Sequence, residues 1–279
     1  MIPFDFEYYR PSSTSEAVQI FMELDAAGKN PRYYGGGTEL ISMARMNSLS
    51  FGAVIDIKAI PECNVLEIDN GHLMLGTTLT LTRLHESNLF PLLAQAGSRV
   101  ADHTIQSKIT LGGNLCGSII YKEALLPLLL TDTEALIAGP SGMKTRQVNA
   151  IFNQSVQLEP AEFIVQLHMA EKYLALPYIH VKKTKQDKIN YPLVTICALK
   201  NGQEIRVAFS GVSDFPFRCS NMEAALNERS RPIDSRVARA LEVMPVRVLN
   251  NLEGSADFRR FILTNLLTSV VGSLEADAI

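Results

Sequence analysis

Two glycine-centred segments constrain the fold of this chain more than any other feature of its sequence. Residues 35–40 read Gly-Gly-Gly-Thr-Glu-Leu, and residues 110–115, about 75 positions later, read Thr-Leu-Gly-Gly-Asn-Leu. Around the first segment the local order is strand, glycine turn and helix start. Because glycine has no Cβ and reaches positive φ without strain, successive backbone N–H groups can point into one hollow and approach a diphosphate closely. Together the segments predict two sides of one phosphate cradle.

Taken alone, the first segment is more typical of a tight structural turn than of a phosphate site, and the second is equally typical of either. The first is not a P-loop, because no Gly-Lys-Ser/Thr follows at the required spacing. It is not the dinucleotide fingerprint either, because Gly-x-Gly-x-x-Gly fails at Leu40. Around the second segment Thr110, Asn114 and the more distant Glu123 provide a hydroxyl, an amide and a carboxylate. These groups suit a nucleotide, with Glu123 reaching ribose hydroxyls.

The charge balance excludes one large class of partner. The chain has 279 residues, of which 47% are hydrophobic and 20% charged, as expected for one large globular domain or two modest ones. A formal net charge of −3 leaves no broad basic surface, so nucleic acid is not an expected partner. The local basic cluster comprises Lys182, Lys183, Lys185 and Lys188.

Cysteine spacing and the N-terminus indicate a cytoplasmic protein without a metal site. The chain has four cysteines, Cys63, Cys116, Cys197 and Cys219, and none has Cys-x-x-Cys spacing. This argues against zinc, an iron–sulfur cluster or a disulfide framework, and it predicts buried thiols in a reducing compartment. No basic segment followed by an apolar stretch opens the chain, and runs such as residues 125–130 are too short for a bilayer, so no membrane contact is expected.

Hydrophobic periodicity predicts a mixture of helices and strands in the first two thirds of the chain. A helix follows Ser13, with Glu16 completing a capping box, and a hairpin turns at Asn70-Gly71. Further helices are predicted over 80–86 and 91–102 and from 124 onward, and further strands over 54–57, 134–138, 144–148 and 162–169. This order is typical of an α+β unit.

A junction near residue 175 separates this unit from a differently ordered C-terminal part. Three strand signals follow it, and then helices are predicted over 220–227, 234–242 and 255–274. The last helix carries an apolar stripe of Phe258, Phe261, Ile262, Leu266 and Val270.

With these motifs the chain resembles the FAD-binding medium subunit of molybdenum hydroxylases, the xanthine dehydrogenase and carbon monoxide dehydrogenase family, over essentially its whole length. Residues 35–40 match the first Gly-Gly-Thr-Asp/Glu loop of that family, and Gly-Gly-Asn-Leu-Cys at 112–116 matches its second, more specific loop. Ordered agreement continues at 54–57, 75–78, 130–134, 138–140, 158–162, 209–212 and 216–218.

The resemblance implies an α+β fold with a two-lobed FAD-binding domain of the vanillyl-alcohol-oxidase/PCMH type. This domain would occupy residues 1–174, with lobes over about 1–57 and 58–174. A smaller C-terminal domain of a three-stranded antiparallel sheet with helices would occupy residues 175–279.

The resemblance also implies a set of residues that bind noncovalent FAD, with no catalytic side chain and no metal ligand. The diphosphate contacts would fall on the two loops, the ribose contact on Glu123, the adenosine end near Phe163 and Ile164, and a flavin neighbour on Lys182. An equally good alternative is that Lys182 only faces solvent together with the other lysines of its cluster. The full set is Tyr33, Tyr34, Gly35, Gly36, Gly37, Thr38, Glu39, Leu40, Thr110, Gly112, Gly113, Asn114, Glu123, Phe163, Ile164 and Lys182.

Several positions depart from the family pattern. The family has an arginine at Gln106, an arginine at Gln186 and an aspartate at Asn190, and an aspartate where Glu123 keeps the carboxylate on a longer arm. Residues 117–122 are bulkier than the family's small stretch, so that Ile120 and Tyr121 would crowd the flavin ring or pack on it.

The function that the resemblance implies is electron transfer as a xanthine dehydrogenase-like flavoprotein subunit. Electrons would arrive from an iron–sulfur small subunit, itself supplied by a molybdopterin large subunit, and would leave through FAD to NAD⁺ or another acceptor. Two other classes stay open: a free-standing flavin reductase of the same fold, and a flavin-free scaffold subunit. A flavin absorbance spectrum separates the scaffold from the other two.

Overall fold

The computed structural model describes residues 1–186 and 190–276, and the chain divides into two compact units. The first unit comprises residues 1–86, 103–117 and 132–171. The second comprises residues 87–102, 118–131 and 172–279. Each unit therefore contains segments that are far apart in the sequence, and each is described by itself.

A small parallel sheet opens the first unit. Its strands are β1 (Glu7–Tyr9), β2 (Pro31–Tyr34) and β3 (Ala53–Asp56), in the order β1-β3-β2. Helices α1 (Thr14–Ala26) and α2 (Thr38–Arg45) contribute to the two cores on either side of it. Ala53 and Ile55 of the central strand face the α1 core, and Val54 faces the α2 core. A strand covered on both faces reads as a continuous apolar run, which explains why the sequence predicted it.

Local capping chemistry fixes the start of α1. Ser13 is the N-cap, and its hydroxyl accepts a hydrogen bond from the backbone N–H of Glu16 at 3.2 Å. The carboxylate of Glu16 accepts from the N–H of Ser12 at 2.7 Å, one residue before the partner of a standard capping box. The predicted helix is confirmed, but the Glu16 side chain binds the N–H of Ser12 instead of that of the N-cap Ser13.

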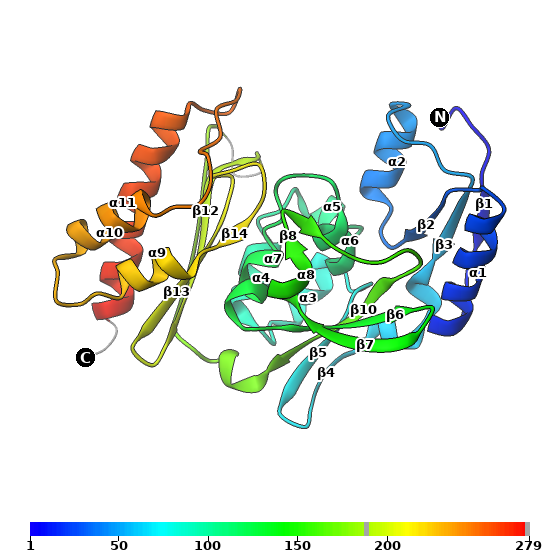
Figure 1. Ribbon diagram of the computed structural model, residues 1–279, viewed down its shortest axis with the longest axis horizontal. Helices are drawn as coiled ribbons and strands as arrows, with labels where there is room; N and C mark the ends of the chain where they lie inside the picture. The colour runs from blue at the N-terminus through cyan, green and yellow to red at the C-terminus, as the bar shows by residue number, and fades with distance from the viewer. Residues whose placement is uncertain (187–189, 277–279) are drawn as a thin grey trace. The chain divides into compact units, whose positions relative to one another are not determined.

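A five-stranded antiparallel sheet forms the rest of the first unit's framework (Figure 1). Its hairpin turns through Asn70 and Gly71, both at positive φ, as the Asn-Gly dipeptide predicts. In sheet order the strands are β4 (Leu66–Asp69), β5 (His72–Gly76), β10 (Phe163–Ala170), β6 (Glu134–Gly139) and β7 (Gly142–Gln147). Short elements complete the unit: 3₁₀ turns η1 (Ile57–Ala59) and η2 (Pro61–Asn64), helices α3 (Leu81–Ser87), α5 (His103–Gln106), α6 (Leu111–Cys116) and α8 (Val148–Ile151), and the ladder of β8 (Phe152–Asn153) with β9 (Ser155–Val156).

The second unit is an antiparallel sheet with helices α9 to α11 packed on one face (Figure 1). The strands are β11 (Tyr178–Thr184), β12 (Pro192–Asn201), β13 (Glu204–Ser210) and β14 (Phe217–Arg218). Alternate residues of β12, namely Val194, Ile196 and Ala198, belong to the core under the helices. The helices are α4 (Pro91–Gly97), α7 (Leu125–Leu130), α9 (Ser220–Leu226), α10 (Ile233–Glu242) and α11 (Ala256–Ala276), and the 3₁₀ turn η3 (Glu171–Tyr173) comes just before β11.

The predicted α+β fold class is confirmed, with three local differences. The C-terminal sheet has a fourth, two-residue strand, β14, and α4 ends at Gly97 instead of reaching residue 102. The predicted stripe of α11 is wrong in part, because Phe258 and Phe261 are 48% and 63% exposed. The buried face of α11 instead carries Arg259, Leu263, Leu267, Val270, Val271 and Leu274. The predicted domain limits at residues 57 and 174 stay predictions.

Two further expectations concern cysteines and membranes. Cys63 and Cys197 are buried as predicted and Cys219 is half-buried, but the prediction is wrong for Cys116, which is exposed. Within the part of the chain that the structure describes, no helix combines the length and the apolar character needed to cross a membrane. The same residues contain no cluster of three or more His, Cys, Asp or Glu side chains arranged to hold a metal ion.

Candidate functional site

The first glycine loop connects β2 to the N-terminus of α2 and leaves backbone donors open. Gly37 is the N-cap of α2 in the left-handed conformation, with φ 71°, and no side chain caps this helix end. Within residues 1–186 and 190–276, no acceptor binds the N–H groups of Gly36, Gly37 and Thr38. Such donors at a helix N-terminus, where the helix dipole is positive, form an anion site.

This loop rests directly on the second glycine segment. A Cβ on Gly35 would lie 2.7 Å from the Thr110 hydroxyl oxygen, and a Cβ on Gly36 would overlap the backbone carbonyl of Lys108. A Cβ on Gly117 would lie 2.6 Å from a carboxylate oxygen of Glu39. The two segments that the sequence singled out therefore lie together, and at Gly36 the backbone of Lys108 approaches so closely that only glycine fits.

Most backbone N–H groups of the second segment are already hydrogen-bonded within the protein, whereas that of Thr110, like those of the first loop, has no acceptor among residues 1–186 and 190–276. The segment is the start of helix α6, and Thr110 is its N-cap, accepting from the N–H of Gly113 at 3.2 Å. The N–H of Asn114 donates to the Thr110 carbonyl at 2.9 Å, and that of Gly112 donates to the Thr77 carbonyl at 2.8 Å. The start of this segment packs against the first loop. FAD contacts at Thr110, Gly112, Gly113 and Asn114 stay proposals.

The aromatic residues before the loop belong to the core of the first unit. The Tyr33 ring lies 4.9 Å from that of Phe21 and 4.5 Å from that of Phe163, centroid to centroid. Its hydroxyl donates to the Ala161 carbonyl at 2.8 Å, and burial raises its pKa. Phe163 and Ile164 of β10 are buried. Tyr33 therefore fixes the end of β2, while an adenosine contact near residues 163–164 stays a proposal.

A charged pair below the first loop was missed by the sequence analysis. Lys58 Nζ lies 2.8 Å from both carboxylate oxygens of Asp56 and donates to the Gly35 carbonyl at 2.8 Å. It also lies 4.4 Å from the centre of the Tyr34 ring. Asp56 additionally accepts from the Tyr8 hydroxyl at 2.6 Å and from the Lys58 N–H at 3.0 Å. No spacing rule identifies such a pair, because it depends on the turn η1 that follows β3.

Removing the Asp56 carboxylate should produce a pH-dependent loss of stability. Burial raises the pKa of Asp56, but hydrogen bonds from Lys58 and Tyr8 outweigh it, so the net pKa is lowered. A lowered pKa in the folded state stabilises the fold above the unfolded pKa, and this stabilisation is lost as the pH falls through the folded value. We expect Asp56→Asn to lower the free energy of unfolding by about 2 kcal/mol at pH 7. Urea titrations at several pH values should show this difference shrinking below about pH 4, and a difference independent of pH would contradict the assignment.

Glu123 and Lys182 form a buried ion pair within the second unit. Lys182 Nζ lies 3.0 Å from a carboxylate oxygen of Glu123, and both side chains are 3% exposed. The same ammonium donates to the Arg99 carbonyl at 2.7 Å. The alternative of a solvated Lys182 is therefore wrong. Nearby His180 on β11 has its pKa lowered to about 4, first by burial and then by the charges of Arg99 and Lys182, so it is neutral at pH 7.

The positions that depart from the family pattern lie in different surroundings. Gln106 is buried in the first unit. Tyr121 is buried in the second unit, where its ring stacks on that of Tyr191 with centroids 4.6 Å apart. Gln186 is exposed and Asn190 is half-buried, and Lys188 lies outside the described residues.

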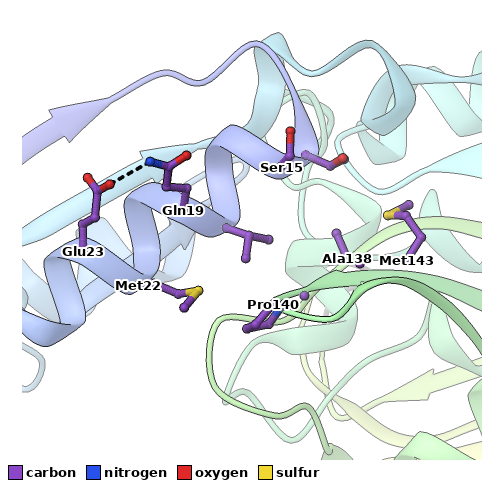
Figure 2. Close-up of a pocket in the computed structure, with 11 residues that line it drawn as sticks. Ser15, Gln19, Met22, Glu23, Ala138, Pro140 and Met143 are labelled. Carbon is purple, nitrogen blue, oxygen red and sulfur yellow. Dashed lines mark hydrogen bonds between the residues drawn. The ribbon is translucent and has the colours of Figure 1, made fainter.

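A separate hollow in the first unit does not match the chemistry of a diphosphate. It has a volume of about 440 Å³ and lies between α1 and the β6–β7 hairpin (Figure 2). Met22, Pro140 and Met143 line it, and its charged residue is Glu23, whose carboxylate accepts from the Gln19 amide at 2.9 Å. The open N–H groups of the first glycine loop suit an anionic ligand better than this hollow does.

The first unit thus combines a β–glycine loop–α segment, whose open backbone donors suit an anion, with an antiparallel sheet. A family model described as the FAD binding domain in molybdopterin dehydrogenase matches residues 4–169. The chain belongs to this family and is a medium subunit of the molybdenum hydroxylase type, as the sequence resemblance predicted. Its cofactor is FAD, and the open donors and the helix N-terminus fit the anionic part of that cofactor.

Individual relatives agree with this assignment. The chain is 26% identical to the carbon monoxide dehydrogenase medium chain of Hydrogenophaga pseudoflava over 175 residues, which cover 61% of this chain and 60% of that one. It is 26% identical to the glyceraldehyde dehydrogenase medium chain of Sulfolobus acidocaldarius over 244 residues, covering 80% and 81%. A solved carbon monoxide dehydrogenase from Hydrogenophaga pseudoflava shares the fold, with a TM-score of 0.87, 22% identity and 99% of each chain covered.

Proposed function

We propose that this chain is the flavoprotein subunit of a xanthine dehydrogenase-like complex and passes electrons through noncovalent FAD. The electrons would come from an iron–sulfur small subunit that a molybdopterin large subunit supplies, and they would leave to NAD⁺ or another acceptor. The observation that carries this proposal is the set of open N–H groups at Gly36, Gly37 and Thr38 on the N-terminus of α2. They suit the diphosphate that links the two halves of FAD.

In this function the bound flavin supplies the redox chemistry, and the protein supplies position and electrostatics. Backbone donors of the first loop hold the diphosphate, and α2 contributes its dipole. Thr110 and Lys108 support the loop from behind, so that its donors keep one direction. The remaining members of the predicted set, among them Leu40, Asn114, Glu123 and Lys182, are proposed FAD contacts on the grounds of the resemblance. We place the protein in the cytoplasm, in accord with its four free cysteines.

The proposal is tested with the purified chain. We expect a flavin absorbance spectrum after purification, or after FAD is added and the excess removed, and release of FAD on denaturation because the binding is noncovalent. A chain that stays colourless in both cases would support the flavin-free scaffold instead. Anaerobic NADH should bleach the flavin if NAD⁺ is the acceptor, and co-purification with two further chains tests the partners.

A further inference from the structure

The ammonium of Lys58 connects a buried carboxylate to the first glycine loop. It lies 2.8 Å from both oxygens of Asp56 and 2.8 Å from the Gly35 carbonyl oxygen. The Lys58 side chain is 40% exposed, whereas that of Asp56 is 5% exposed. The pair is therefore oriented, with its carboxylate inside the protein and its cation at the surface beside the loop. An oriented pair of this kind presents positive potential to the solvent side even though its net charge is zero.

The contact with Gly35 determines where the next backbone donor points. The peptide between Gly35 and Gly36 is trans, and in a trans peptide the C=O and N–H point in opposite directions. When Lys58 holds the Gly35 carbonyl, the N–H of Gly36 is turned away from the lysine. Within the described residues that N–H has no acceptor. Glycine has no side chain that limits the rotation of this peptide, so the contact with Lys58 adds to the packing against Thr110 and Lys108 in fixing its direction.

We propose that Lys58 is a positioning residue for FAD, which acts by holding the Gly35 carbonyl so that the N–H groups of the loop face the diphosphate. Asp56 fixes the ammonium through two short contacts, and the Tyr8 hydroxyl in turn donates to Asp56 with a hydrogen bond of 2.6 Å. Tyr8 thus positions Asp56, Asp56 positions Lys58, and Lys58 positions the Gly35 carbonyl. This inference rests on the proposed FAD site at the first loop, and it adds a determinant that recognises the diphosphate rather than the flavin ring.

The experiment measures ligand affinity of the apoprotein for FAD, for ADP as a probe that has the diphosphate without flavin, and for riboflavin as a probe without phosphate. Lys58→Met should weaken FAD and ADP each by about tenfold or more, as expected for loss of a charge-assisted hydrogen bond. Riboflavin affinity should not change. Lys58→Arg should restore FAD affinity to within about threefold of the original protein, because it keeps the donor and the charge.

Two additional variants separate positioning from damage to the fold. Lys58→Met combined with Asp56→Asn removes the ammonium without leaving a buried charge unpaired, and it should bind FAD as weakly as the single variant. Lys29→Met breaks an exposed ion pair with Glu7 in the same unit and should leave all three affinities unchanged.

Unchanged FAD affinity in both variants that lack Lys58 would overturn the inference, and so would an equal loss of riboflavin affinity. Failure of the proposed site itself has a different signature. The unaltered chain would then bind neither FAD nor ADP, so the two failures are distinguishable.

Discussion

Replacing Gly36 by valine is expected to abolish FAD binding while both units stay folded. A Cβ at this position would overlap the carbonyl of Lys108, which is backbone and cannot rotate away. The loop would have to leave the wall formed by residues 108–110, and the open N–H groups of Gly36 and Gly37 would lose their common direction. We expect an affinity loss of at least about a hundredfold, because a multidentate anion contact of several charge-assisted bonds is lost at once. Flavin content after purification and a fluorescence titration with FAD measure it.

The control is a glycine whose replacement introduces strain without a clash. Gly71, in the β4–β5 hairpin of the same unit, has φ 75°, and a Cβ there would meet no atom within 4 Å. Gly71→Ala should cost about 1 kcal/mol of stability and leave FAD affinity unchanged. If Gly36→Val bound FAD like the original protein, the first loop would not be the diphosphate site. Gly36 itself does not have a positive φ, and Gly37 is the left-handed residue of this loop. Position 36 therefore requires glycine because of the close approach of Lys108 and not because of its φ angle.

Features encoded by neighbouring residues were predictable from the sequence. The Asn70-Gly71 hairpin, the Ser13 cap and the apolar strand β3 each follow from chemistry within a few positions. The two glycine segments were identified for the same reason. Their meeting was an inference from similarity of composition, and the structure brings them together through contacts at Gly35 and Gly36.

Features that depend on hydrogen bonds between residues far apart in the sequence were not predictable. Whether the N–H of Gly112 is open depends on the Thr77 carbonyl, 35 positions away, and the role of Lys58 depends on where η1 turns. Hydrophobic periodicity also assigned part of the buried face of α11 wrongly, because apolar residues occur on both sides of that helix. The side that faces the core is the one that contains the buried Arg259. The Arg259 guanidinium donates to the carbonyls of Leu193 and Gly211 at 2.5 and 2.7 Å, contacts that no helical pattern reveals.

Replacing Lys182 by methionine is expected to cause the largest loss of stability among single substitutions proposed for this chain. The change leaves the carboxylate of Glu123, 3% exposed, without a cation. Removing one partner of a buried ion pair costs about 3–5 kcal/mol, because the remaining charge is desolvated and uncompensated. Glu123→Gln should cost less, since Lys182 keeps its hydrogen bond to the Arg99 carbonyl at 2.7 Å. Free energies of unfolding from urea titrations give both values.

The double variant Lys182→Met with Glu123→Gln decides whether this pair serves the fold or FAD. With both charges removed, stability should return to within about 2 kcal/mol of the original protein, because no buried charge remains unpaired. A double variant as unstable as Lys182→Met would mean that the ammonium stabilises the unit through Arg99 and not through Glu123. When the double variant has the stability expected here, its FAD affinity reports the contribution of both groups directly. Lost affinity would favour a contact with the ribose or the flavin, and retained affinity would assign the pair to the stability of the second unit.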